Sequence, residues 1–147
     1  MKDPAEMPVI GANHKRTISI SLHLVDQRLC EWEQRLEGHL EKGVMYQLQD
    51  DIAPAQRKEL RRRIAETRER LDSLRKKLGL EPARPSLARM IVGQATILWE
   101  MLAELNSSGL RGYGTVPASL AKTIDPAGEA LVEELSGIVR LMSQDEP

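Results

Sequence analysis

The sequence predicts an all-α protein: a helical bundle of three long helices and a shorter fourth helix, without a sheet. The first reason is that apolar residues recur at alternating steps of four and three, which is the spacing of one face of a helix. The second reason is composition, because the apolar residues are mostly Leu, Ile, Ala and Met, and Phe is absent. These residue types suit helices.

The length of 147 residues suits one domain, so we expect an irregular N-terminal arm over residues 1–15 and a single helical-bundle domain over residues 16–147. A chain this long can bury a sizeable core without a metal or a disulfide. The single cysteine, Cys30, cannot form an internal disulfide. Neither a leader peptide nor a long uninterrupted apolar segment is evident, so we expect a cytoplasmic protein that does not enter a membrane.

The first helix is expected over a segment that also has a strand-like pattern. Residues 17–24 alternate between polar and apolar side chains. A longer helical stripe begins inside this segment and continues past it: Ile18, Leu22, Val25, Leu29, Trp32 and Leu36. Because Ile20 and Leu24 lie nearly opposite that stripe, the start of the helix is apolar on two sides. We expect the N-terminal arm or another chain to cover the second side.

The second helix is expected after a weak point in the chain. Gly38 and Gly43 disfavour helix, so we expect a kink or break near Gly43, although the apolar residues of 44–52 could extend the first helix. Pro54 suits the first position of the second helix, and Gly79 suits its end. The apolar stripe of this helix comprises Leu60, Ile64, Thr67, Leu71, Leu74 and Leu78.

The third helix, expected over residues 86–106, is apolar over more than half of its circumference and should be central. Gln94 lies within its apolar stripe, as Thr67 does in the second helix. A buried polar group without a partner costs about 1–3 kcal/mol, so each needs an internal partner or a ligand. A hydrogen bond that sets the helix register is the more common outcome.

The shorter fourth helix is expected to begin at Asp125 and Pro126, which suit an N-cap and a first turn. Its apolar stripe comprises Leu131, Leu135, Ile138 and Met142. Before it, residues 107–117 form a flexible connection rich in Gly and Ser, to which we assign no role.

No arrangement of residues typical of catalysis is present, so we expect no enzyme and assign neither a catalytic residue nor a cofactor. His23, Asp26 and Cys30 lie along one side of the first helix and are residue types that bind Zn²⁺. A polar stripe between core and water explains them more simply. We therefore assign no metal site.

Positive charge is concentrated in residues 57–77, which contain ten basic and four acidic residues, whereas the whole chain has a net charge of −1. Such a segment could contact phosphates. Acidic residues are interleaved, however, and aromatic stacking groups are absent from it. We favour a solvated helix face and do not expect a nucleic-acid partner.

The function that these observations favour is a non-enzymatic protein-interaction or scaffolding bundle, in the form of a homodimer. Apolar helix surface beyond what one core can hide is typical of a partner site. We predict that Ile20, Leu24 and Trp99 contribute to the interface. The alternative is a small-molecule- or metal-binding bundle with a pocket near Gln94 or His23, and the third possibility is a nucleic-acid-associated protein acting through residues 57–77.

Overall fold

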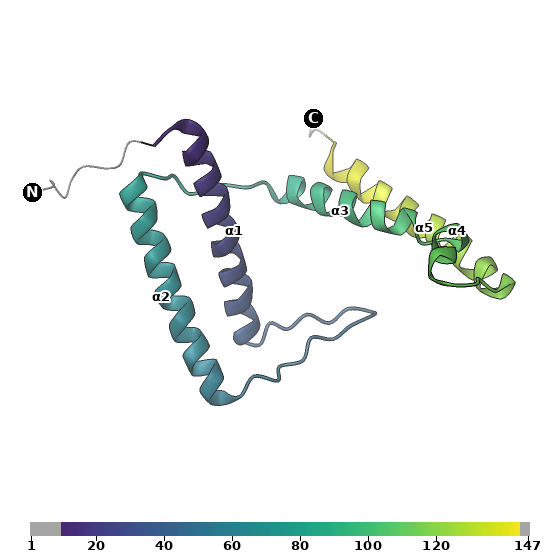
Figure 1. Cartoon of the computed structure of the whole chain (residues 1–147), viewed down its shortest axis with the longest axis horizontal. Helices are drawn as coiled ribbons and strands as arrows, with labels where there is room; N and C mark the ends of the chain where they lie inside the picture. Colours follow the sequence, from purple (N-terminus) through teal and green to yellow (C-terminus); the bar gives the residue numbers. More distant parts are fainter. Residues whose placement is uncertain (1–9, 145–147) are drawn as a thin grey trace, which may run out of the picture. The chain divides into compact units, whose positions relative to one another are not determined.

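The computed structural model describes residues 10–144 and confirms the all-α class (Figure 1). Its helices are α1 (Ala12–Leu36), α2 (Pro54–Leu78), α3 (Leu87–Ala103), α4 (Ser107–Leu110) and α5 (Ala118–Met142), with a 3₁₀ turn η1 at Arg111–Tyr113. Within the described part of the chain, extended pairing is limited to one isolated antiparallel bridge between Lys42 and Gln47.

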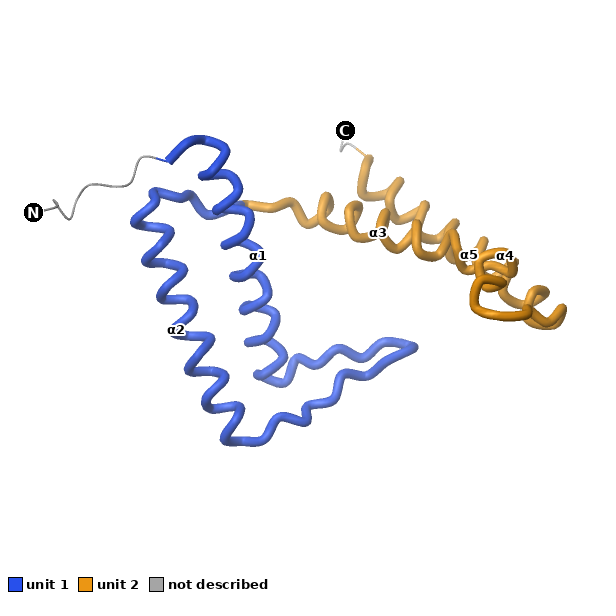
Figure 2. The backbone as a smooth tube through the Cα atoms, in the orientation of Figure 1, with its two compact units in different colours: residues 1–83 blue, residues 84–147 orange. Residues whose placement is uncertain are grey.

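The chain divides into two compact units, residues 1–83 and residues 84–147 (Figure 2). Unit 1 contains α1 and α2, and unit 2 contains α3, α4 and α5. In each unit the longer helices pack against each other as a helical hairpin. The expectation of one bundle over residues 16–147 stays a prediction, and each unit is described by itself below.

Helix α1 confirms that the strand-like segment 17–24 is helical. It begins at Ala12, so the end of the predicted arm over residues 1–15 is helical, and residues 1–9 of that arm lie outside the described part. Leu29 and Leu36 are buried, but Val25 and Trp32 of the same predicted stripe are more than two-fifths exposed. Only one edge of the stripe therefore packs against α2.

The core of unit 1 is small. It consists of the buried side chains of Leu29, Leu36 and Ile64, against which three partly buried residues pack: Ile52, Leu60 and Leu71. With so few buried side chains, each one carries a large share of the apolar burial that stabilises the unit.

Helix α1 ends at Leu36, so the expected extension toward Gly43 is wrong. Gly38 follows with φ +96°, a left-handed conformation that favours glycine. The carbonyl of Leu36 accepts hydrogen bonds from the guanidinium groups of Arg57 at 2.8 Å and Arg61 at 3.2 Å. Cations are favourable at the negative end of a helix. Residues distant in sequence thus stabilise this helix end.

Helix α2 begins and ends as the sequence predicts. Pro54 occupies the first helical position, and the Gln56 side chain accepts a hydrogen bond from the Ala53 N–H at 3.2 Å. At the other end Gly79 has φ +61°, and the Leu80 N–H donates to the Arg75 carbonyl at 2.9 Å. These are local interactions, which explains why sequence alone could locate both ends.

In unit 2, α5 runs back along α3 (Figure 1). Ala95 of α3 and Gly128 of α5 are buried at this contact. The approach at Gly128 is close, because a Cβ atom there would lie 2.5 Å from the carbonyl oxygen of Leu105. Gly128 therefore allows the end of α3 and the middle of α5 to approach each other closely.

Helix α5 corrects the prediction of a short fourth helix beginning at Asp125. It begins at Ala118 and spans 25 residues, with Pro126 inside it. Proline cannot donate to the carbonyl of Lys122, but both residues are exposed, so water can satisfy that carbonyl. The Asp125 carboxylate accepts hydrogen bonds from the N–H and the hydroxyl of Ser107, at 2.7 and 2.8 Å. It joins α4 to α5 and does not cap its own helix.

Asp125 should make the stability of unit 2 depend on pH. Hydrogen bonds from the Ser107 N–H, and then from its hydroxyl, hold the pKa of Asp125 below its usual range. A lowered folded-state pKa stabilises the fold above the unfolded-state pKa, and this contribution is lost as the pH falls through the folded-state value. We therefore expect Asp125→Asn to lower the urea midpoint at pH 7, and the difference from wild type to shrink below about pH 4.

The measurement is urea unfolding followed by Trp99 fluorescence in a Trp32→Phe background, because these are the two tryptophans of the chain and Trp99 lies in unit 2. Glu129→Gln, an exposed position on the same helix, is the control. An Asp125→Asn difference that stays constant from pH 7 to pH 3 would contradict the role of the ionised carboxylate.

Candidate functional site

Apolar side chains on the surface greatly outnumber buried ones. Within residues 10–144 only five apolar side chains are buried, whereas nineteen large apolar side chains are exposed. Single exposed apolar residues are normal, but a contiguous patch marks an interaction site. The arrangement of the exposed residues on each unit is therefore informative.

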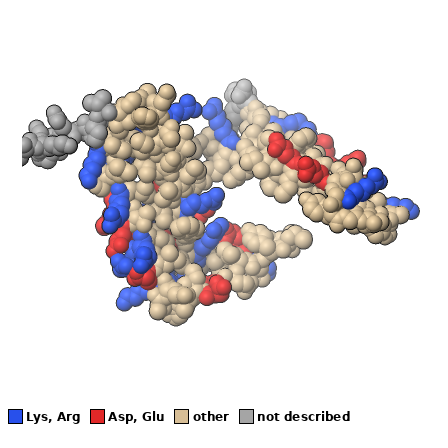
Figure 3. Space-filling view, viewed as in Figure 1, with Lys and Arg blue, Asp and Glu red and all other residues tan. Residues whose placement is uncertain are grey.

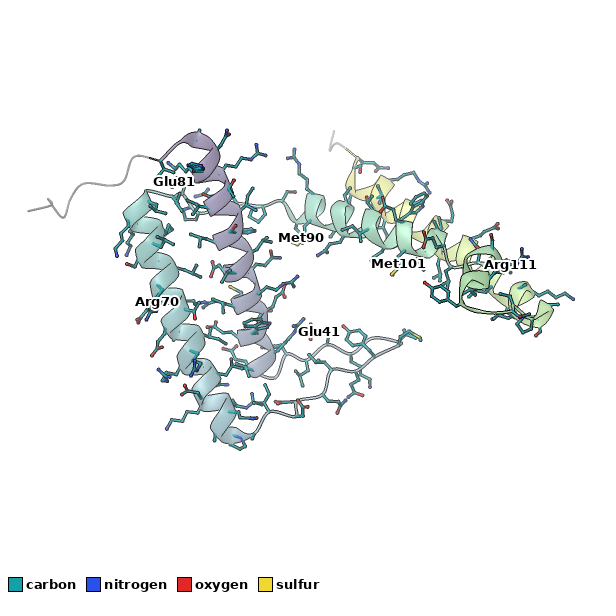
Figure 4. The ribbon with its side chains drawn as sticks, in the orientation of Figure 1. Glu41, Arg70, Glu81, Met90, Met101 and Arg111 are labelled. Carbon is teal, nitrogen blue, oxygen red and sulfur yellow. The ribbon has the colours of Figure 1, made fainter. Side chains whose placement is uncertain are left out.

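On unit 2, one such set follows α3. The exposed fractions are 69% for Leu87, 69% for Ile97, 45% for Leu98 and 63% for Met101. Met90 and Gln94 continue the same stripe, which advances by alternating steps of three and four from Leu87 to Met101. Met90 and Met101 lie along the same side of α3 (Figure 4). This spacing is the one that helices use to pack against a partner helix.

A second set follows α5. The exposed fractions are 42% for Leu120, 48% for Leu131, 42% for Ile138 and 60% for Leu141. Leu131 and Ile138 of the predicted stripe are exposed, because α5 turns Gly128 and its neighbours toward α3. Leu135 and Met142 of the same predicted stripe are half-buried.

The two sets lie on the same side of the helical hairpin. At 3.6 residues per turn, the α3 set is displaced by about 120° from the buried residue Ala95, and the α5 set by about 90° from the buried residue Gly128. When each helix is viewed along its own chain direction, its exposed set is rotated from its buried residue in the same sense, clockwise or anticlockwise, as on the other helix. Because the two helices run antiparallel, rotation in the same sense places both exposed sets on the same side of the hairpin. We call these eight residues the α3–α5 face: Leu87, Ile97, Leu98, Met101, Leu120, Leu131, Ile138 and Leu141.

The predicted interface residues Ile20 and Leu24 are both about half exposed, on the side of α1 away from Leu29 and Leu36. That position leaves them accessible to a partner, and their role in an interface stays a prediction. Trp99 is also exposed, but around α3 it is displaced from Ala95 in the opposite direction to Ile97. It is therefore not part of the α3–α5 face.

The two predicted buried polar residues are not buried. Gln94 is exposed, because α3 turns the neighbouring Ala95 toward α5 and Gln94 outward. Thr67 is half-buried, and its hydroxyl donates to the Arg63 carbonyl of its own helix at 2.8 Å. Neither residue therefore needs a ligand inside this chain.

His23, Asp26 and Cys30 line a groove of about 470 Å³ in unit 1. The Arg68 guanidinium donates to the Cys30 sulfur at 2.9 Å and pairs with Glu33 at 2.8 Å. Over residues 10–144, no group of three or more His, Cys, Asp or Glu side chains could hold a metal ion. The structure thus places the thiol against an arginine and gives the zinc alternative no support. The small-molecule alternative stays a prediction.

Ion pairs occupy much of the positive charge of α2, and Figure 3 shows basic and acidic side chains interleaved along it. Arg62 pairs with Glu59 and Glu66, and Arg63 also pairs with Glu59. The guanidinium of Arg62, followed by that of Arg63, lowers the pKa of Glu59 to about 2. Arg75 and Lys76 pair in the same way with a neighbouring aspartate. This pattern is typical of a solvated helix face.

The loop between α1 and α2 carries a smaller apolar site. The Leu48 N–H donates to the Glu41 carbonyl at 3.0 Å, so residues 41–48 form a short hairpin. Its tip exposes Val44 fully and Met45 almost fully. A two-stranded hairpin alone has little intrinsic stability in water, and this loop has fewer exposed large apolar side chains than the α3–α5 face.

Sequence reasoning identified neither the α3–α5 face nor the hairpin tip. The signal for the face was present, because the residues from Leu87 to Met101 follow a second seam beside the one that contains Ala95. The prediction of a single bundle places that seam in the core. Distinguishing the two seams requires knowing which side of α3 contacts α5.

The helices within residues 10–144 include none that combines the length and the apolar character needed to cross a membrane. Comparison of the chain with models of protein families, with curated proteins and with solved structures found no match. The functional argument for this chain therefore depends on its own surfaces, and among those described above the α3–α5 face has the most exposed large apolar side chains.

Proposed function

We propose that the chain is a non-enzymatic interaction module that self-associates through the α3–α5 face, so that two copies of unit 2 form a four-helix bundle. The observation that carries this proposal is the position of the two exposed sets on one side of the hairpin. A helical hairpin that exposes one apolar side is half of a four-helix bundle, and an identical hairpin supplies the other half.

The size of the face suits this role. The exposed fractions of its eight side chains add up to between four and five fully exposed residues. At roughly 180 Å² each, they amount to about 800 Å², which is what one partner contributes to an interface of standard size. Burying this area twice supplies enough hydrophobic stabilisation to offset the entropy lost on association.

The distribution of polar residues also supports a second copy as the partner. Arg89, Thr96 and Glu100 lie on the opposite side of α3 and would stay in water when the face is covered. Two copies related by a twofold axis present the same surface to each other, so a face with few charges meets a face with few charges. Glu134 of α5 is the one charged residue of the two helices at the rotational position of these sets.

The test is the mass of the full chain in solution, measured by light scattering after size-exclusion chromatography. Wild type should be a dimer at micromolar concentration, and Ile97→Glu should be a monomer. The twofold axis places the new carboxylate in the interface twice, so we expect the dissociation constant to rise at least about 100-fold.

Thr96→Glu is the matched control, because it adds the same charge one residue away, on the polar side of α3. It should leave the dimer intact. Ile97 is already exposed within its unit, so circular dichroism should show an unchanged helix content in both variants. A wild-type chain that stays monomeric at high micromolar concentration, or an Ile97→Glu chain that dimerises as wild type does, would overturn the proposal.

A further inference from the structure

Gln94 is the one polar residue of the α3 stripe that runs through Leu87, Met90, Gln94, Ile97 and Met101. It is exposed and lies at the middle of that stripe, seven residues from each end. On α5, Ile138 lies at nearly the same position along the hairpin as Gln94. Gly128 lies against Leu105, the helices run antiparallel, and Ile138 is about as far from Gly128 along its helix as Gln94 is from Leu105. The amide is thus surrounded by the apolar residues of the α3–α5 face.

Covering that face with a second copy would remove the Gln94 amide from water. A buried amide without a partner costs about 1–3 kcal/mol. A glutamine side chain both donates and accepts, so it can satisfy an identical side chain. In a dimer with a twofold axis, a residue close to the axis meets its own copy.

We propose, resting on the self-association proposed above, that Gln94 pairs with the Gln94 of the second copy across the twofold axis and thereby selects one antiparallel register of α3 against α3. The physical reason is that sliding α3 by one turn would place each amide against an apolar side chain. A single polar residue in an apolar seam is known to select register and oligomer state in this way, at some expense of stability.

The register makes a specific geometric prediction. An axis at Gln94 brings Leu87 of one copy next to Met101 of the other, because each lies seven residues from the axis. Neither of these two residues meets its own copy. Cysteines form a disulfide only when their Cα atoms are about 4.4–6.8 Å apart, so cross-linking can detect this arrangement.

The experiment uses the full chain with Cys30→Ser, which removes the only native cysteine. Under mild oxidation, Gln94→Cys should form a covalent dimer at least about 10-fold faster than Leu87→Cys or Met101→Cys does by itself. A mixture of the Leu87→Cys and Met101→Cys chains should cross-link to each other. Light scattering confirms that each variant is a dimer before oxidation.

Two outcomes distinguish a failure of the Gln94 pairing from a failure of the proposed self-association. If the wild-type chain is a monomer, the proposed function fails. If the chain is a dimer but Leu87→Cys cross-links to itself faster than Gln94→Cys, the helices are parallel or in another register, and only the role of Gln94 is overturned.

A second variant tests the polar contact itself. Gln94→Leu should tighten association, because it replaces the amide by an apolar side chain. It should also give a mixture of dimers and larger oligomers by native mass spectrometry. A Gln94→Leu chain that forms a single dimer with the wild-type cross-linking pattern would show that the amide does not select the register.

Discussion

Replacing Ile64 with alanine should destabilise unit 1 by about 3 kcal/mol, within the range measured for deleting buried isoleucine methyl and methylene groups. Ile64 is the most buried large side chain of the described residues, with 2% of its surface exposed. It packs with Leu29 and Leu36, the other two buried side chains of this small cluster. So small a core has few neighbours that can move to fill the space left by the side chain.

The measurement is urea unfolding followed by Trp32 fluorescence in a Trp99→Phe background, which reports on unit 1 alone. Leu74→Ala is the matched control on the same helix, because Leu74 is 37% exposed and should cost less than about half as much. Equal losses for the two variants would show that α1 and α2 do not pack through Ile64.

Replacing Gly128 with alanine should destabilise unit 2 by about 1–3 kcal/mol, the usual cost of forcing an additional carbon into a closely packed contact. In an exposed helix interior the same change is stabilising by about 1 kcal/mol. The sign is reversed here because the new Cβ would lie 2.5 Å from the carbonyl oxygen of Leu105. A backbone atom cannot move aside as a flexible side chain can, so α3 and α5 would have to separate.

Gly137→Ala supplies the opposite result on the same helix. The nearest atom to a Cβ at Gly137 is the Arg140 Nη2, 3.8 Å away at the end of a flexible side chain. We expect this variant to stabilise unit 2 by about 0.5–1 kcal/mol. Urea unfolding followed by Trp99 fluorescence in the Trp32→Phe background measures both. If Gly128→Ala were also stabilising, α5 would not approach α3 as closely as described.

Local signals explain the parts of the fold that the sequence predicted. Pro54 and Gly79 mark the ends of α2 through interactions with residues no more than five positions away, and both ends are confirmed. The helical stripe from Ile18 to Leu36 likewise outweighs the alternation of residues 17–24, because a helix repeats every 3.6 residues over a longer span. The all-α class follows from patterns of this kind.

Contacts between distant residues explain the parts that sequence reasoning missed. Helix α1 ends at Leu36, where Arg57 and Arg61, more than twenty positions away, bind its last carbonyl. The Asp125 carboxylate binds Ser107 in α4, and α5 begins before it at Ala118. No local pattern reports such partners, so the predicted boundaries near Gly43 and Asp125 were wrong.

The candidate site shows the same division. The sequence by itself determined that α3 is apolar over most of its circumference and that Ile20 and Leu24 lie opposite the packing stripe of α1. Only the tertiary structure decided that Ala95 faces α5 and that Gly128 faces the end of α3, which turns Gln94, Ile97 and Met101 outward. The reason is that periodicity shows which residues share a helix face, whereas the element packed against that helix decides which face is covered.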